Sequence, residues 1–388
     1  MKQSRARIRH RSRTDGCQRS PRVAHYVMRQ RIDSIDFVRG VVMILMAIDH
    51  VRVFAGIPAG GTSPGVFFTR WITHFVAPAF IFLAGTSAYL RGASSKFLLT
   101  RGAWLILLEL TVIRIAWTFN FDFGHYMLAG VIWVIGWSMI ILAAAVHLPP
   151  RIVGAIGVAI IALHNVIDFL PQPQDPNPLL RLLYLGGAVG PLFILYVIVP
   201  WAGVMMAGYG FGTVMELDPA RRRTICLRLG FAMTILFVVL RWIDVYGDPR
   251  PWAHKRGLFG FIATTKYPAS LEFLLMTLGP ILILIALAEG WREGIATTFG
   301  RVPMFYYLLH IPVIHIAACI VSLMREGRVD PWLFGNFPVN PPEQPPGYMW
   351  SLGLLYLVWL ICVIALYFPS RWYARVRATK RYPWLSYL

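Results

Sequence analysis

Ten long apolar runs, separated by short loops, constrain this chain more than any other feature. A helix needs roughly 20 apolar residues to cross the hydrocarbon core of a bilayer. The chain of 388 residues is 57% hydrophobic and only 14% charged, with a mean hydropathy of +0.59, which is too apolar for a soluble domain of this length. We therefore predict an all-α integral membrane protein, a polytopic bundle of about ten transmembrane helices. The predicted helices are 37–56, 71–90, 102–119, 127–146, 152–169, 188–210, 229–246, 269–289, 302–322 and 350–369.

The basic residues gather in loops that would lie on one side of the membrane. If the N-terminus is inside, the tail and the loops near 91–101, 151, 221–228, 292–301 and 371–381 face the cytoplasm and hold most of the Lys and Arg. Cytoplasmic loops of membrane proteins carry such an excess. The net charge of +19 therefore favours contact with lipid headgroups over binding of nucleic acid. We predict a multi-pass protein of the inner (plasma) membrane with both termini cytoplasmic.

The chain is expected to have two parts. Residues 1–35 are basic and irregular and are predicted to be a disordered cytoplasmic tail, unless Met28 is the true start. They lack the pattern of a secretory signal. Residues 36–388 form the predicted membrane domain, in which 152–169 is the least secure helix because it ends in Asp168 before a proline-rich stretch. The four cysteines are far apart without a CxxC pair, so neither a metal site nor a disulfide framework is indicated.

The first apolar run carries four ionisable residues at its edges, Asp36, Arg39, Asp49 and His50. Charged groups are costly in hydrocarbon, so they mark candidate functional sites. Arg39 and His50 are about three helical turns apart, which places them on one face and roughly 16 Å apart along the axis. Asp36 lies three residues before Arg39, within reach for a helical pair. The alternative is structural: Arg39 contacts lipid phosphate, and Asp49 neutralises Arg52 near the outer surface.

Two more histidines fall in the predicted membrane segments. His74 is near the outer end of the second run, where it can approach His50 from an adjacent helix, and His310 is near the middle of the ninth. Imidazole exchanges its proton readily near neutral pH. Together the three rings predict a general-base site or a proton path. A lone histidine on an apolar helix is, however, more often a satisfied core residue.

The third run contains Glu109 and Arg114, which are five residues apart and so do not share a helix face. Each is expected to meet another helix. The small residues Gly85, Thr86 and Ser87 in the second run predict close packing between helices.

Four stretches resemble a known family. They are "RIDSIDFVRGVVMILMAIDHVR", "FFTRWITHFVAPAFIFLAGTSAYL", "TKYPASLEFLLMTLGP" and "FGRVPMFYYLLHIPVIH". In combination they resemble the bacterial domain of unknown function DUF1624, which is grouped with the catalytic domain of heparan-alpha-glucosaminide N-acetyltransferase in the wider clan of transmembrane acyltransferases. The resemblance runs from about Arg31 to the end of the tenth apolar run.

The resemblance implies roles for particular residues. The wider families begin with Arg-Gly followed by His, as Arg39, Gly40 and His50 do here, and carry a late YLLH-x-P, matched at 307–312. It implies transfer of an acyl group, acetyl above all, from cytoplasmic acyl-CoA to a sugar or glycan acceptor at the other face, with no metal. The histidine proposed as active in the heparan-type enzyme has no counterpart here, because Pro64 stands near its place.

The implied mechanism is a hypothesis that assigns each ionisable group a task. Asp36 and Arg39 would face the CoA phosphates, Asp49 would orient His50 or raise its basicity, and His50 would act as general base. A covalent acyl-imidazole route is the alternative. His74 and His310 would shape the pocket or take over the role of the base.

Two other functions can use the same buried residues. One is a proton-coupled transporter, although the sequence shows no inverted repeat. The other is a membrane scaffold without activity. An oligomer is compatible with all three.

Overall fold

The computed structural model describes residues 31–60, 63–171, 173–252, 257–291, 294–339, 341–380 and 382. Residues Ile32–Leu388 form one compact unit, to which the description below applies. Most of the predicted tail, residues 1–30, lies outside the described residues. The first helix begins at Asp33, inside the stretch predicted as tail.

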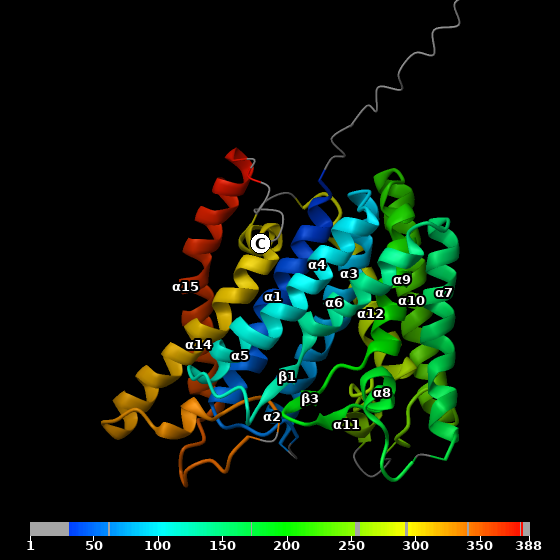
Figure 1. The fold of residues 1–388 in the computed structure, drawn as a ribbon. Coiled ribbons are helices and arrows are strands. Elements are labelled where there is room, and N and C mark those ends of the chain that lie inside the picture. Colours follow the sequence, from blue (N-terminus) through cyan, green and yellow to red (C-terminus); the bar gives the residue numbers. More distant parts are fainter. Residues whose placement is uncertain are drawn as a thin grey trace, which may run out of the picture. The chain divides into compact units, whose positions relative to one another are not determined.

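Within the described residues, ten long helical segments correspond one to one with the ten predicted runs (Figure 1). Six of them are long and apolar enough to cross a membrane, and two shorter ones are also apolar. The prediction of an all-α membrane bundle is confirmed. The segments are α1 (Asp33–Phe54), α2 (Pro64–Trp71) continuing through a 3₁₀ turn (Ile72–Phe75) into α3 (Val76–Leu90), α4 (Ser95–Leu108) continuing through a π-helical turn (Glu109–Ile113) into α5 (Arg114–Thr118), α6 (Val131–Ala145), α7 (Pro150–Leu163) with a 3₁₀ turn (His164–Phe169), α9 (Ile198–Met215), α10 (Pro219–Ile243), α12 (Leu271–Leu287), α14 (Pro303–Glu326) and α15 (Leu352–Thr379).

Two predicted helices start too early because short strands precede them. Strand β1 (Met127–Ala129) pairs in parallel with β3 (Leu192–Ile194), which pairs antiparallel with β2 (Gly187–Val189). The registers are Met127↔Leu192 and Gly187↔Ile194. The predicted helix 188–210 was therefore wrong over its first ten positions, and α9 begins only at Ile198. An apolar run does not by itself distinguish a strand from a helix, and the left-handed glycine at 190 makes the turn between β2 and β3.

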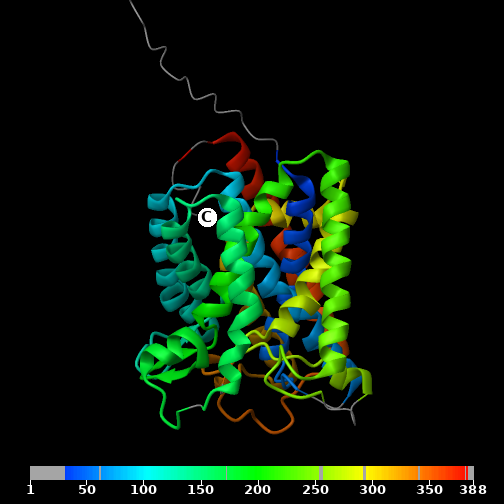
Figure 2. The same ribbon diagram turned by 90° about the vertical axis from the view of Figure 1, so that its right-hand side faces the viewer.

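The helix ends fall into two groups (Figures 1 and 2). We call one the basic end; it holds the start of α1, the α3–α4, α6–α7 and α9–α10 connections, and the end of α15. Arg377 donates to the Arg301 carbonyl at 3.0 Å, and Arg301 lies 3.8 Å from Asp33, which fixes the first and last helices together there. The opposite, long-loop end holds the described residues of the segments 119–130, 170–197, 244–270 and 327–351, which exclude 172, 253–256 and 340. The segment 152–169, the least secure prediction, runs between the two ends as α7 and its 3₁₀ turn.

Helices α3 and α9 cross at two glycines. A Cβ atom on Gly85 would overlap the Met205 carbonyl oxygen, and one on Gly208 would overlap the Phe82 carbonyl oxygen. Thr86 Oγ1 donates to the Gly208 carbonyl at 3.0 Å across this contact. The packing role predicted for the small residues of the second run is therefore what the structure shows for Gly85 and Thr86.

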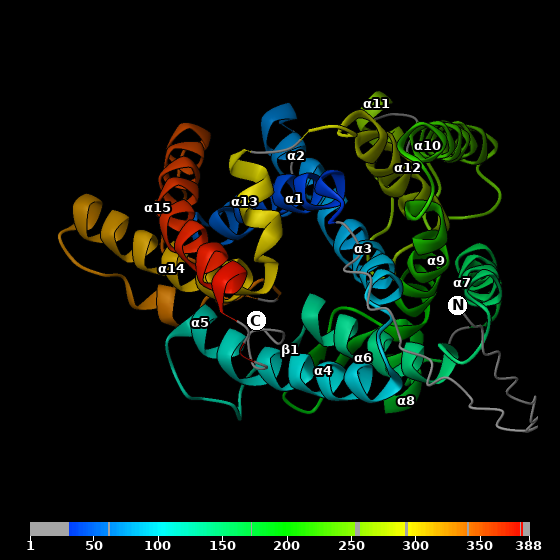
Figure 3. The same ribbon diagram turned by 90° about the horizontal axis from the view of Figure 1, so that it is seen from above.

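The first helix is held on several sides. Seen from the basic end, α1 lies beside α3 and beside the short helix α13 (Ile295–Arg301), with α14 and α15 beyond (Figure 3). Gly40 permits the contact with α13, because a Cβ atom there would overlap the Ala296 carbonyl oxygen. Of its 22 residues, 14 are buried, so α1 is a core helix despite its charges.

Candidate active site

Two histidines from distant parts of the chain meet inside the bundle. Nδ1 of His50, on α1, lies 2.6 Å from Nε2 of His310, on α14. Their rings stack with centroids 4.8 Å apart. His310 is fully buried, whereas His50 retains partial exposure. The contact joins one residue predicted as the base to another predicted to shape its pocket.

The hydrogen-bond partners assign the tautomers of this pair. Nδ1 of His310 lies 2.5 Å from the Tyr307 carbonyl oxygen, which can only accept, so this nitrogen carries the hydrogen. Nε2 of a neutral His310 must then accept, and Nδ1 of His50 donates to it. Nε2 of a neutral His50 is left with its lone pair. The contact with His310 therefore fixes the tautomer of a neutral His50.

Aromatic rings surround the pair. Trp117, on α5, meets the His50 ring edge-on at 5.0 Å, and Tyr306 stacks on His310 at 5.8 Å. These rings restrict the orientation of both imidazoles. A base held in one orientation loses little entropy when its substrate arrives.

Asp49 holds two arginines. Its carboxylate accepts from Nε of Arg52 at 2.9 Å and from Nη1 of Arg70 at 2.6 Å. The Asp49–Arg52 pair expected from the sequence is therefore present. Orientation of His50 was expected from Asp49, but the group in contact with Nδ1 of His50 is His310.

Sequence reasoning missed Arg70 and Lys266, although both lie within electrostatic reach of Asp49 and His50. Lys266 belongs to the loop before α12, and its ammonium lies over the rings of Tyr267 and Tyr196 at 5.3 and 5.9 Å. Burial lowers the pKa of Lys266 from its usual value. A basic residue in a loop looks like a surface residue in the sequence, so only the quoted "TKYP" motif could have pointed to it.

The ring contact of His74 is made with a residue outside the histidine pair. It is in the 3₁₀ turn between α2 and α3, and its ring packs 5.5 Å from that of Phe273. Its Nδ1 is buried, and no partner for it is found in the described part of the chain. The rings that contact His50 in the described part of the chain are those of His310 and Trp117, so the structure does not show the predicted approach of His74 to His50.

Arg39 and Asp36 lie near the basic end of α1. Arg39 contacts Asp36 at 3.3 Å, donates to the Leu83 carbonyl at 3.2 Å, and bonds to Ser87 of α3. The predicted pair is present, and the arginine is turned toward a neighbouring helix. Although Arg39 and His50 share a face, their long side chains reach different helices.

The sequence of the chain was compared with known protein families. A family profile described as "Heparan-alpha-glucosaminide N-acetyltransferase, catalytic" matches residues 31–242. The match covers more than half of the chain. The protein belongs to this family. A search of curated proteins finds no match. Together with its membrane helices, membership identifies the chain as a membrane protein of transferase type.

The family match starts where the resemblance was predicted to start, at Arg31, but ends well before the tenth helix. In this heparan-alpha-glucosaminide N-acetyltransferase-like chain, the matched part therefore holds Asp36, Arg39, Asp49, His50 and His74. His310 and Lys266 lie beyond it, on α14 and in the loop before α12. The site thus combines matched and unmatched segments.

Glu109 and Arg114 have structural partners in this family member. Glu109 accepts from the Ile132 backbone N–H at 3.1 Å, at the start of α6, as expected for a residue that meets another helix. The same expectation was wrong for Arg114. It donates to the Tyr126 and Asn120 carbonyls at 3.2 and 2.6 Å and so binds the loop that follows its own helix.

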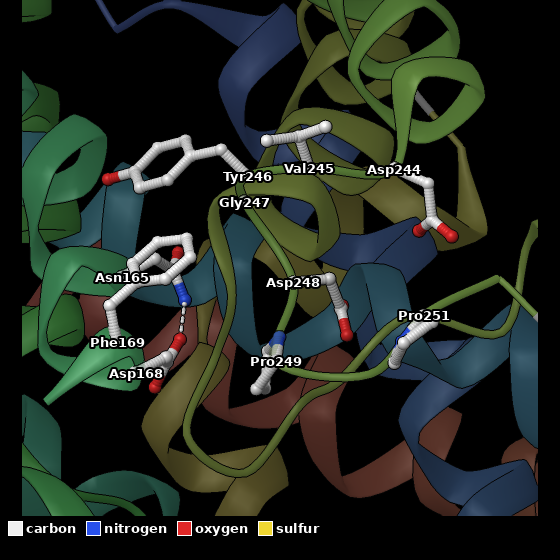
Figure 4. A pocket seen from close by; sticks show the side chains of 10 residues that line it. All are labelled: Asn165, Asp168, Phe169, Asp244, Val245, Tyr246, Gly247, Asp248, Pro249 and Pro251. Atoms are coloured by element: carbon white, nitrogen blue, oxygen red, sulfur yellow. Dashed lines mark hydrogen bonds between the residues drawn. The ribbon is translucent and has the colours of Figure 1, made fainter. Parts of the chain in front are cut away.

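A cavity of about 200 Å³ opens at the long-loop end, between residues 165–169 and 244–251 (Figure 4). Its carboxylates have protein partners: Asp168 accepts from Asn165 at 2.7 Å, and Asp248 accepts from the Thr265 backbone and the Ser270 hydroxyl, both at 2.7 Å. The carboxylates of Asp168 and Asp248 therefore stabilise the loops that line the cavity. Through Thr265 it also fixes the backbone next to Lys266.

Proposed function

We propose that this protein transfers an acyl group, acetyl in the first instance, from acyl-CoA to an extracytoplasmic sugar or glycan acceptor, with His50 as general base. The observation that supports this most is the lone pair left on Nε2 of His50 by its bond to His310. Packing alone would not require two polar imidazoles to be hydrogen-bonded to each other inside an apolar bundle. Membership of the N-acetyltransferase family supports the class of reaction.

The proposed reaction uses that lone pair. An acceptor amine or hydroxyl attacks the thioester carbonyl while Nε2 of His50 takes its proton. The C–S bond breaks, and the CoA sulfur leaves with the proton returned by His50. Positive charge on His50 is shared with His310 through the Nδ1 hydrogen. In the covalent alternative, Nε2 attacks the thioester carbonyl and the C–S bond breaks, so that CoA leaves as a thiolate. The acceptor then attacks the acyl carbonyl, the bond to Nε2 breaks, and the acceptor's proton passes to the CoA thiolate.

The donor is proposed to enter from the basic end. Arg39 and Asp36 lie there, about three helical turns before His50, and Arg suits bidentate contact with phosphate. This end collects most of the basic loops, so we also propose that it faces the cytoplasm of a cell with the protein in its inner membrane. The acceptor would then arrive from the long-loop end.

The test is acyl transfer by the purified full-length chain. Labelled acetyl-CoA is incubated with a panel of amino sugars and glycans, and CoA release and labelled product are followed together. Acceptor-dependent release supports the proposal. A proton-coupled transporter would instead move solute into vesicles without releasing CoA, and an inactive scaffold would do neither.

A further inference from the structure

The long-loop side of the site holds more buried positive than negative charge. Arg52, Arg70 and Lys266 lie around a single carboxylate, Asp49. Asp49 pairs with the two arginines, at 2.9 and 2.6 Å. Across the described residues, no carboxylate lies within 4.0 Å of the Lys266 ammonium. With neutral histidines, a neutral Tyr267 phenol and a protonated Lys266, the cluster has a formal excess of two positive charges. Such an excess is expensive away from water unless a counter-ion is bound.

Lys266 is fixed in place by two tyrosines and, among the described residues, is not paired with a carboxylate. Its ammonium lies over two tyrosine rings, at 5.3 Å from Tyr267 and 5.9 Å from Tyr196, and Lys266 itself is 8% exposed. Its backbone pairs with Ala269, and Asp248 holds the adjacent Thr265 through both backbone and hydroxyl, at 2.7 Å each. Cation–π contacts orient an ammonium but leave its charge in place. The ammonium is therefore positioned to meet an anion.

A second unsatisfied group lies beside the cluster. Nδ1 of His74 is buried without a partner among the residues described, and Arg70 and Lys266 lie within electrostatic reach of its ring. Buried polar atoms normally have hydrogen-bond partners. A ligand bearing an oxyanion would supply a partner for His74 and a counter-charge for Lys266 together.

We propose that Arg70, Lys266 and His74 form a subsite for an anionic group, a carboxylate or a phosphate, carried by the acceptor sugar. The assignment of the anion to the acceptor rests on the proposed function. The anion site itself is inferred from the buried charges and from the unpartnered nitrogen of His74. It makes an anionic sugar the preferred substrate class over a neutral one.

The position of the cluster assigns the anion to the acceptor. Arg52 lies two residues beyond His50 on α1, on the side away from Arg39, and about 20 Å from Arg39 along the helix axis. Arg70 and Lys266 come from α2 and from the loop before α12, both at the long-loop end. CoA phosphates bound near Arg39 would therefore lie at the other end of the first helix.

The experiment measures binding without an acyl donor, so it does not depend on catalysis. Glucuronate, glucose 6-phosphate and glucose are titrated into the purified full-length protein in detergent. The two anionic sugars should bind at least ten-fold more tightly than glucose, as expected for bonds to charged groups. CoA should not compete with them. Equal affinity for all three sugars would overturn the proposal, and displacement of glucuronate by CoA would assign the site to the donor.

Three variants locate the site. Lys266→Met should weaken binding of glucuronate about ten-fold or more and leave glucose unchanged, whereas Lys266→Arg should retain much of the preference. Lys96→Met removes an exposed lysine at the basic end and is the matched control. Thermal unfolding reports whether each variant is folded. A folded Lys266→Met protein with the wild-type preference would contradict the assignment. Anion preference in a protein that never releases CoA would leave the subsite standing while the proposed reaction fails.

Discussion

The tautomer of His50 is set by its hydrogen bond to His310, a residue 260 positions later in the chain. The sequence indicated both histidines separately, from their place in apolar runs and from the family motifs. It could not indicate that they touch, because pairing across that separation depends on how α1 and α14 pack. The same holds for Asp49, whose second arginine, Arg70, comes from another helix.

His310 is expected to act through the tautomer of His50. His310→Gln keeps a carbonyl oxygen that can accept from Nδ1 of His50, so kcat should fall only a few-fold. His310→Leu removes the acceptor, and kcat should fall about ten-fold or more, with KM little changed. Steady-state acetyl transfer with each purified variant gives both constants. Equal loss in the two variants would show that packing, and not the hydrogen bond, is what His310 supplies.

Arg39 is expected to matter for the donor. Arg39→Lys keeps the charge but loses the planar fork that reaches Asp36 and α3 together. Acetyl-CoA should bind about ten-fold more weakly in a direct titration, and the unfolding midpoint should change less than that loss suggests. Arg91→Lys, an exposed arginine at the same end, is the control. Unchanged affinity in Arg39→Lys would remove the residue from the donor site.

At the scale of elements, the sequence predicted the positions of the helices but not the three short strands. Each of the ten apolar runs corresponds to a helical segment in the described part of the chain, and six of these segments are long and apolar enough to cross a membrane. The short sheet of β1, β2 and β3 was hidden inside two of those runs, because its strands are as apolar as the helices that follow. The loop that carries Lys266 was noticed only as an unusually basic stretch.

The α3–α9 crossing offers a test of packing. Gly208→Ala places a methyl group against the Phe82 carbonyl, so the helices must separate, and the free energy of unfolding should fall by on the order of 1 to 3 kcal/mol. Gly353→Ala in α15 is the matched control, because a Cβ atom there meets only the Ser351 hydroxyl oxygen, at 3.9 Å, and it is expected to be neutral or slightly stabilising. Thermal unfolding in detergent compares them. A Gly208→Ala protein as stable as Gly353→Ala would contradict the close crossing.

At the scale of the whole molecule, the two ends of the bundle differ in charge and in loop length. The sequence predicted the sidedness from its basic loops, and the structure gathers those loops at one end, where Arg301 and Arg377 tie α1, α13 and α15 together. The excess of buried positive charge at the other end could not be predicted, because it arises from three segments that are far apart in sequence.

This division predicts the topology. Reporter fusions after residues 95, 225 and 380 should all read cytoplasmic, since each position falls at the basic end. A fusion after residue 175, in the long loop after α7, is the opposite control and should read extracytoplasmic. A cytoplasmic signal at 175, or an extracytoplasmic one at 225, would contradict the assignment of the two ends.

The most direct test of the central proposal is the rate of acetyl transfer by His50→Gln. Glutamine keeps much of the volume and can still donate a hydrogen bond to Nε2 of His310, but it cannot take a proton near neutral pH. The proposed role as general base predicts a loss on the order of 10² to 10⁴ in kcat with the protein still folded. His125→Gln, at an exposed histidine of the long-loop end, should be unaffected. A folded His50→Gln protein with wild-type turnover would show that His50 is not the base.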